Sequence, residues 1–158
     1  MMNESPVRAT AGARRRGLLL IWGAQFMSLA LMFGLTYVVR PEANADGNHT
    51  LAWALGALGF MSFLGSFLVK RKLLAQAAGK RRLDLGTTAY VVAFAMCELT
   101  AVLGFLAYVI TGLSYALHSF IIAAVGLVFH FPVSGALDHI EGDGQNGDGG
   151  TNLNKTTF

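Results

Sequence analysis

The sequence is organised around one apolar stretch, Thr88–Ile110, which reads TAYVVAFAMCELTAVLGFLAYVI. An α-helix rises about 1.5 Å per residue, so a helix of this length can cross the hydrocarbon layer of a bilayer, which is about 30 Å thick. Glu98, at its centre, is its one charged residue. Three further stretches have similar length and composition: Gly17–Val39, Leu51–Val69 and Leu113–Phe131.

The composition of the whole chain is that of a membrane protein. Of its 158 residues, 54% are hydrophobic and only 13% are charged, whereas soluble domains carry about 25% charged residues. The mean hydropathy is +0.51. This length accommodates one domain of four spans. Cys97 is the single cysteine, so the chain forms no internal disulfide and no cysteine-rich zinc site.

Within a bilayer every backbone N–H and C=O must be paired inside the segment, so apolar spans of this length are expected to be helices. We predict an all-α integral membrane protein with four transmembrane helices, arranged as two antiparallel hairpins. Residues 1–16 form a basic cytoplasmic N-tail, and residues 17–131 form the membrane domain, with spans at 17–39, 51–69, 88–110 and 113–131. Residues 132–158 form a C-tail that is expected to be disordered, because Gly142–Gly150 reads GDGQNGDGG and has little apolar surface to bury.

Lysines and arginines are distributed unevenly between the two ends of the predicted spans. The N-tail has four, the connection between the second and third spans has six and the C-tail has one, whereas the first connection has one and the third has none. Because cytoplasmic loops carry the excess of basic residues, both termini are predicted to be cytoplasmic, in a bacterial inner membrane. This topology and contact with anionic lipid explain the net charge of +3, so no nucleic-acid partner is expected.

The two predicted hairpins show a weak internal repeat. Residues 51–55 (LAWAL) align with residues 113–117 (LSYAL), and with a shift of 70 positions Ser28 aligns with Glu98. Such matches also arise by chance in sequences of this composition. If the repeat reflects a duplication, the hairpins are expected to pack as a pseudo-symmetric pair about an axis along the membrane normal.

Glu98 is the main candidate functional residue, because a charged side chain at the bilayer centre costs about 2.5–3.5 kcal/mol and is seldom without a role. Ser28 and Ser62 are expected at a similar depth on the first and second spans. One interpretation is an ion-binding site formed by Glu98, Ser62 and Ser28. The other is a neutral Glu98 that joins helices through a hydrogen bond to a serine or a backbone carbonyl.

The second span also carries small residues at helical spacing, which are typical of close helix packing. They are Ala52, Gly56, Gly59, Ser62 and Ser66.

The residues around Glu98 resemble a known family. The segment Ala95–Phe105 reads AMCELTAVLGF and is similar to the ion-carrying helix of the proteolipid, or c, subunits of rotary ATPases, with Ala101 and Gly104 at the family's small positions. The resemblance extends over residues 51–110. It implies a proteolipid-like oligomer in which Glu98 binds a proton or a sodium ion.

No cofactor or metal is expected. His118 and His130 are twelve residues apart, or about 18 Å along a helix, so one helix cannot offer both to a single haem or metal. A single axial bond from either histidine to a pigment or haem stays open. The sequence contains no Gly-rich phosphate loop, nucleophile elbow or paired carboxylates, which argues against catalysis.

Two functions therefore remain open for this non-enzymatic membrane subunit. In the first, the chain forms an ion-binding oligomer with itself or with other membrane subunits, and Glu98 exchanges H+ or Na+. In the second, it is a structural or accessory subunit that stabilises a larger bioenergetic complex, and Glu98 is neutral.

The predicted topology can be tested by labelling. Single cysteines introduced at Asp46 and Gln76, in a background where Cys97 is replaced by alanine, should react with impermeant maleimides from opposite sides of the membrane. Labelling of both positions from one side would contradict the four-span arrangement.

Overall fold

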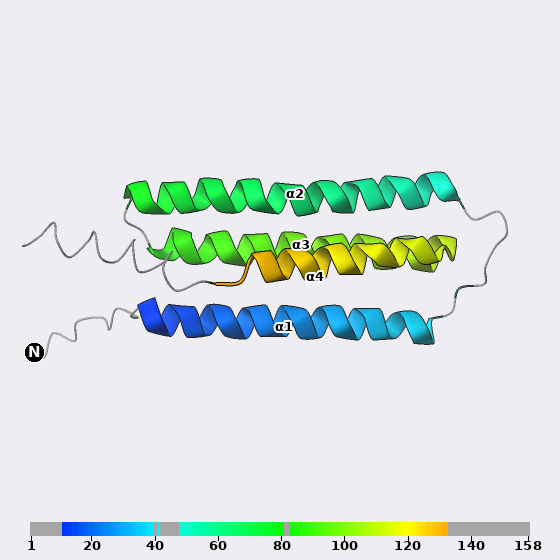
Figure 1. Ribbon diagram of the computed structural model, residues 1–158, viewed down its shortest axis with the longest axis horizontal. Helices are drawn as coiled ribbons and strands as arrows, with labels where there is room; N and C mark the ends of the chain where they lie inside the picture. The colour runs from blue at the N-terminus through cyan, green and yellow to red at the C-terminus, as the bar shows by residue number, and fades with distance from the viewer. Residues whose placement is uncertain (1–10, 40, 42–47, 81–82, 133–158) are drawn as a thin grey trace, which may run out of the picture.

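The computed structural model describes residues 11–39, 41, 48–80 and 83–132. Within these residues it contains four α-helices and one short 3₁₀ helix (Figure 1). The predicted C-tail from residue 133 onward and the first ten residues lie outside the described part of the chain. The helices are α1 (Ala11–Val38), α2 (His49–Lys80), α3 (Leu83–Thr111), η1 (Ser114–Leu117) and α4 (His118–Phe129).

Three of these helices, α1, α2 and α3, are long and apolar enough to cross a membrane. The fold is thus an all-helical bundle of the membrane type, as predicted. The fourth element differs from the predicted continuous span at 113–131, because η1 comes first and α4 has only 12 residues. Pro132 explains the end of α4, since a proline disfavours helical geometry in the residue before it.

The helices extend further than the predicted spans. Residues 70–80, expected in a polar loop, continue α2 to Lys80, and α3 begins at Leu83 instead of residue 88. Residues 11–16 of the predicted N-tail already belong to α1. The extension of α2 reads KRKLLAQAAGK, which is rich in strong helix formers. Hydropathy marks where a chain leaves the membrane and not where its helix ends.

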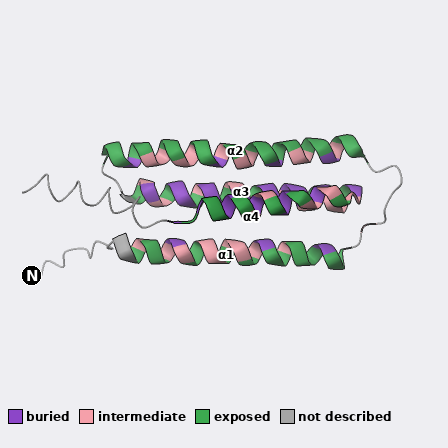
Figure 2. Ribbon diagram, in the orientation of Figure 1, coloured by how far each residue is buried: buried purple, intermediate pink, exposed green. Residues whose placement is uncertain are grey.

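Helix α3 is the centre of the bundle and packs against α1, α2 and α4. In the most apolar part of each long helix, 44% of the residues are buried in α3, against 22% in α2 and 11% in α1. Figure 2 shows this difference, with green exposed surface along much of α1 and α2. The core includes Leu18, Phe94, Cys97, Phe120 and Leu127.

The turn between α3 and α4 brings these two helices into close antiparallel contact. Gly112 adopts a positive φ of 69°, which glycine accepts without steric cost. A Cβ on Gly104 of α3 would overlap Ser119 and lie 3.0 Å from the carbonyl oxygen of Ala116. A Cβ on Gly126 of α4 would lie 2.7 Å from Cys97 Sγ. The two glycines therefore set the distance between the helices.

The first two helices do not repeat this arrangement. In Figure 1, α1 and α2 lie on opposite sides of α3 and α4, and α1 packs on α3 and α4. The expected pseudo-symmetric pair of hairpins is therefore wrong. The longer connection between α1 and α2 allows them to separate, whereas the short α3–α4 turn does not.

The close packing at Gly104 gives a stability prediction. Gly104→Ala should lower the free energy of unfolding by about 1–3 kcal/mol, because the added methyl group forces α4 away from α3. Gly34→Ala is the matched control: its Cβ meets nothing within 4 Å, and alanine favours helix by up to about 1 kcal/mol. Unfolding in mixed detergent micelles, followed by circular dichroism, measures both changes. Equal effects would contradict the assigned contact.

Candidate functional site

Glu98 lies at the edge of the buried side of α3. The residues one turn away on one side, Phe94 and Ala101, are buried, whereas Ala95 is exposed and Glu98 itself is half-buried. Ser28 Oγ of α1 donates a hydrogen bond to Glu98 Oε1 at 2.7 Å. The structure thus brings together two of the three residues of the predicted ion site.

Ser62, the third residue, is not placed with them. Its hydroxyl donates to the carbonyl oxygen of Met96 at 3.0 Å. Ser28 approaches α3 from α1 and Ser62 approaches it from α2, and these helices lie on opposite sides of α3 (Figure 1). Sequence predicts the depth of a residue in a span, but the side of the helix it contacts depends on packing.

Part of the set of small residues on the second span packs closely in the bundle, whereas a Cβ on Gly56 would meet nothing within 4 Å. Ala52, Gly59 and Ser66 are buried, and Gly56 and Ser62 are half-buried. Thr100 Oγ1 donates to the carbonyl oxygen of Gly59 at 2.9 Å. A Cβ at Gly59 would lie 3.4 Å from the carbonyl oxygen of Thr100. Close approach therefore allows side-chain to backbone hydrogen bonds between the two helices.

Helix α1 is attached to the bundle through polar contacts along its length. Besides Ser28, Trp22 Nε1 donates to the carbonyl oxygen of Leu127 at 2.8 Å, and Tyr108 Oη donates to the carbonyl oxygen of Thr36 at 3.4 Å. The contacts Arg14–Asp84 and Ser28–Glu98 both join residues 70 positions apart. Helices α1 and α3 are therefore parallel and in register over most of their length.

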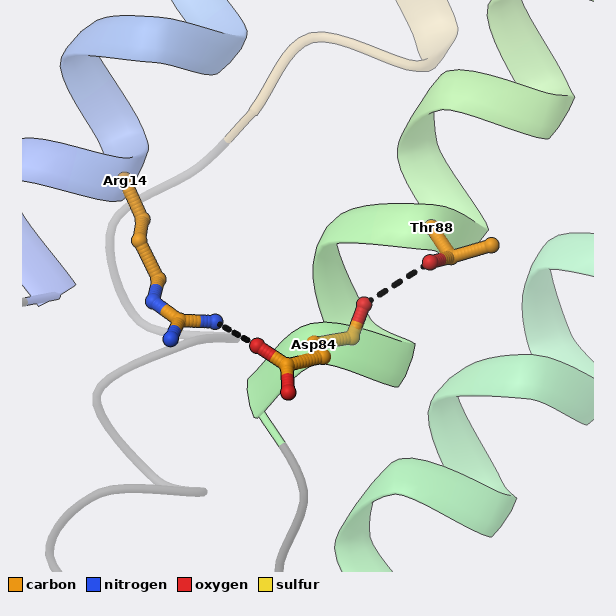
Figure 3. A network of polar contacts seen from close by, with 3 residues as sticks. All are labelled: Arg14, Asp84 and Thr88. Carbon is orange, nitrogen blue, oxygen red and sulfur yellow. Dashed lines mark hydrogen bonds and ion pairs between the residues drawn. The ribbon is translucent and has the colours of Figure 1, made fainter. Parts of the chain in front are cut away.

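An ion pair joins the N-terminal end of α1 to the N-terminal end of α3. Arg14 Nη1 lies 2.6 Å from Asp84 Oδ1, and Thr88 Oγ1 donates to the main-chain oxygen of Asp84 at 2.9 Å (Figure 3). The Asp84 side chain is 68% exposed, so this pair contributes at most about 1 kcal/mol.

A second group of polar contacts lies at the C-terminal end of α4, around His130, which is only 1% exposed. His130 Nε2 is 2.8 Å from Ser66 Oγ, and His130 Nδ1 is 3.5 Å from Lys70 Nζ. The Lys70 ammonium also lies 4.3 Å from the centre of the Tyr90 ring. We call these four residues the His130 cluster: Ser66, Lys70, Tyr90 and His130. The cluster joins α2, α3 and the end of α4.

The hydrogen-bond directions in the His130 cluster follow from its donors and acceptors. Ser66 Oγ lies 2.6 Å from the carbonyl oxygen of Phe63, which can only accept, so the hydroxyl hydrogen points there. The Ser66 oxygen then accepts from His130 Nε2–H. With the proton on Nε2, the Nδ1 atom of His130 accepts from the Lys70 ammonium. The imidazole is thus assigned as a neutral ring between a cation and a hydroxyl.

Sequence reasoning missed the His130 cluster. From the sequence alone, His130 is only a possible axial ligand of a pigment or haem, and Lys70 is one of the basic residues that indicate the cytoplasmic side. The available signal was Ser66 and Lys70 at i and i+4, which share one face of α2. Nothing in the sequence shows that the end of the fourth helix meets this face.

His118 and His130, the two histidines of the predicted fourth span, lie at opposite ends of α4. Exposed His118 lies near the start of α4, with Nδ1 2.7 Å from the carbonyl oxygen of Tyr115. His130 immediately follows the last residue of α4. Among the described residues, no three His, Cys, Asp or Glu side chains come close enough to hold a metal ion.

Comparisons with protein-family models, curated proteins and solved structures find no match to this chain. The resemblance to rotary ATPase proteolipid subunits therefore stays a prediction from the residues around Glu98.

The His130 cluster gives a prediction that separates the two helix-end histidines. His130→Ala should lower the free energy of unfolding by about 2–4 kcal/mol, because it removes buried hydrogen bonds and leaves a cavity between α2 and α4. His118→Ala, at an exposed position, should change it by less than about 0.5 kcal/mol. Unfolding of both variants in mixed micelles checks this, and an equal loss would argue against the cluster.

Proposed function

We propose that this chain is a non-enzymatic subunit of a membrane assembly, in which the mid-membrane Glu98 fastens α1 to the rest of the bundle. The observation that carries the proposal is the 2.7 Å hydrogen bond from Ser28 to Glu98. It uses the carboxyl group for a contact inside the chain. A protonated carboxyl keeps its carbonyl oxygen as the acceptor of this bond, so a neutral Glu98 serves this role.

The low burial of α1 supports this role for Glu98. Only 11% of the most apolar part of α1 is buried, so apolar packing alone holds this helix weakly. In a bilayer, packing and hydrogen bonds between helices take the place of the hydrophobic effect that holds helices together in water. A hydrogen bond at mid-depth therefore contributes to the position of α1.

The remaining apolar surface is available to lipid and to other subunits. Leu20, Met27 and Leu31 on α1 are 76%, 72% and 71% exposed, and Leu58 and Met61 on α2 are 58% and 65% exposed. We propose that these faces meet the bilayer and neighbouring membrane subunits or further copies of this chain. In this proposal α1, α2, α3 and the predicted span 113–131, which includes η1 and α4, each cross a bacterial inner membrane, with both termini in the cytoplasm.

The alternative function is the binding of H+ or Na+ at Glu98 in a proteolipid-like oligomer. The observation in its favour is that Glu98 is only partly buried, which leaves it within reach of an ion from outside the chain. A sodium site would need oxygen ligands beyond Ser28, and Ser62 bonds instead to Met96. A site completed by a second copy of the chain would supply them.

A double-mutant cycle tests the proposed role of Glu98. Ser28→Ala and Glu98→Leu should show a coupling of about 0.5–1.5 kcal/mol in the free energy of unfolding, the range found for hydrogen bonds between membrane helices. Ser62→Ala is the matched control, since its hydroxyl bonds to the Met96 carbonyl and should show no coupling to Glu98→Leu. Coupling confined to Ser62 would contradict the proposal.

Ion uptake separates the two functions. The purified chain in liposomes, with a potassium diffusion potential and a pyranine or sodium indicator inside, should show no uptake that depends on Glu98. Glu98→Gln keeps an acceptor for Ser28 and removes the exchangeable proton, so it should match the wild-type chain. Uptake by the wild-type chain that Glu98→Gln abolishes would replace our proposal with the ion-binding function.

A further inference from the structure

We propose that the His130 cluster holds Lys70 as a binding site for the phosphate headgroup of an anionic lipid, whose acyl chain lies on Phe67 and Phe129. This inference is independent of the role assigned to Glu98. It concerns the opposite side of α3 and the basic end of the bundle.

The position of Lys70 is the first argument. Lys70 follows directly on the predicted span 51–69, and His130 follows the last residue of α4. Lys70 thus lies where apolar sequence gives way to basic sequence, within reach of lipid headgroups, whereas Ser66, Tyr90 and His130 lie inside the predicted spans. Lys70 is half-buried, with its Nζ atom between the Tyr90 ring and His130 Nδ1.

The charge balance of Lys70 is the second argument. Neither neighbour is an anion, because Tyr90 presents its ring face and His130 accepts as a neutral imidazole. No described carboxylate pairs with Lys70, and the ion pair Arg14–Asp84 involves α1 and α3. A half-buried ammonium with no counter-ion among the described residues attracts a phosphate, and its N–H groups not used by His130 can donate to phosphate oxygens.

The apolar surface beside Lys70 is the third argument, and it points to a lipid instead of free phosphate. Phe67 lies three residues before Lys70 on α2, and its ring centre is 4.5 Å from His130 and 6.2 Å from Phe129. Phe67 is 36% exposed and Phe129 is 68% exposed. A cation thus lies next to exposed aromatic rings on the membrane side, which matches a phosphate joined to a hydrocarbon chain.

Neighbouring basic residues provide a matched control. Arg71 and Lys72 directly follow Lys70 and are exposed. Successive residues on a helix point about 100° apart, so these two side chains leave α2 in other directions. A general attraction of anionic lipid to basic residues would involve them equally, whereas the proposed site depends on Lys70.

Native mass spectrometry of the full chain in mild detergent tests the site, with phosphatidylglycerol and phosphatidylcholine of identical acyl chains as probes. The wild-type chain should retain phosphatidylglycerol in preference. Lys70→Gln should reduce this retention about tenfold, because it removes a charge-assisted hydrogen bond to the phosphate, and Arg71→Gln should reduce it much less. Equal losses in the two variants, or full retention by Lys70→Gln, would overturn the proposal.

Two further measurements hold even if Lys70→Gln fails to fold. Phe129→Ala, at an exposed position, should weaken phosphatidylglycerol retention, whereas Val128→Ala, 59% exposed on the adjacent face, should not. Inorganic phosphate at millimolar concentration should fail to displace the lipid from the wild-type chain. Displacement by inorganic phosphate, or equal effects of the two α4 variants, would overturn the assignment of the acyl chain to Phe67 and Phe129.

Discussion

The bundle depends on close approach of helices to α3. On the α4 side, the absence of a side chain on Gly104 allows Ser119 to lie against the α3 backbone. On the α2 side, Gly59 allows Thr100 to reach a backbone carbonyl. Where lipid is as apolar as the helices, such contacts supply the packing and hydrogen bonds that hold helices together. The core of the protein therefore combines small residues at the closest helix contacts with buried large side chains such as Phe94, Phe120 and Leu127.

Helix α1 is held by a different principle. It has little buried surface, and polar contacts join it to α3 and α4 from Arg14 at one end to Thr36 near the other. Because α1 and α3 are parallel and in register, Ser28 lies at the depth of Glu98 and donates a hydrogen bond to its carboxyl group. The polar residue that looks most like a functional site thus also makes a hydrogen bond within the chain.

The sequence predicts the depth of residues better than their direction. The length of each apolar stretch placed Ser28, Ser62 and Glu98 at one level, but only helix packing decides that Ser28 faces Glu98 and Ser62 faces Met96. The His130 cluster could not be predicted, because it needs the end of α4 to meet one face of α2. The helix ends could not be predicted for a related reason. Hydropathy indicates which residues contact lipid, whereas the helices continue beyond those residues into water.

Two adjacent residues of α3 show how the polar centres are related. Cys97 Sγ lies 4.0 Å from Ser66 Oγ in the His130 cluster, whereas Glu98 faces Ser28 of α1. Neighbouring side chains on a helix point about 100° apart. Glu98 and the His130 cluster therefore lie on different sides of α3. On the α4 side Cys97 packs closely on Gly126, since a Cβ there would lie 2.7 Å from Cys97 Sγ. Rotation of α3 about its own axis would disturb both this contact and the Ser28–Glu98 hydrogen bond, so contacts on two sides of α3 favour a single orientation of the helix.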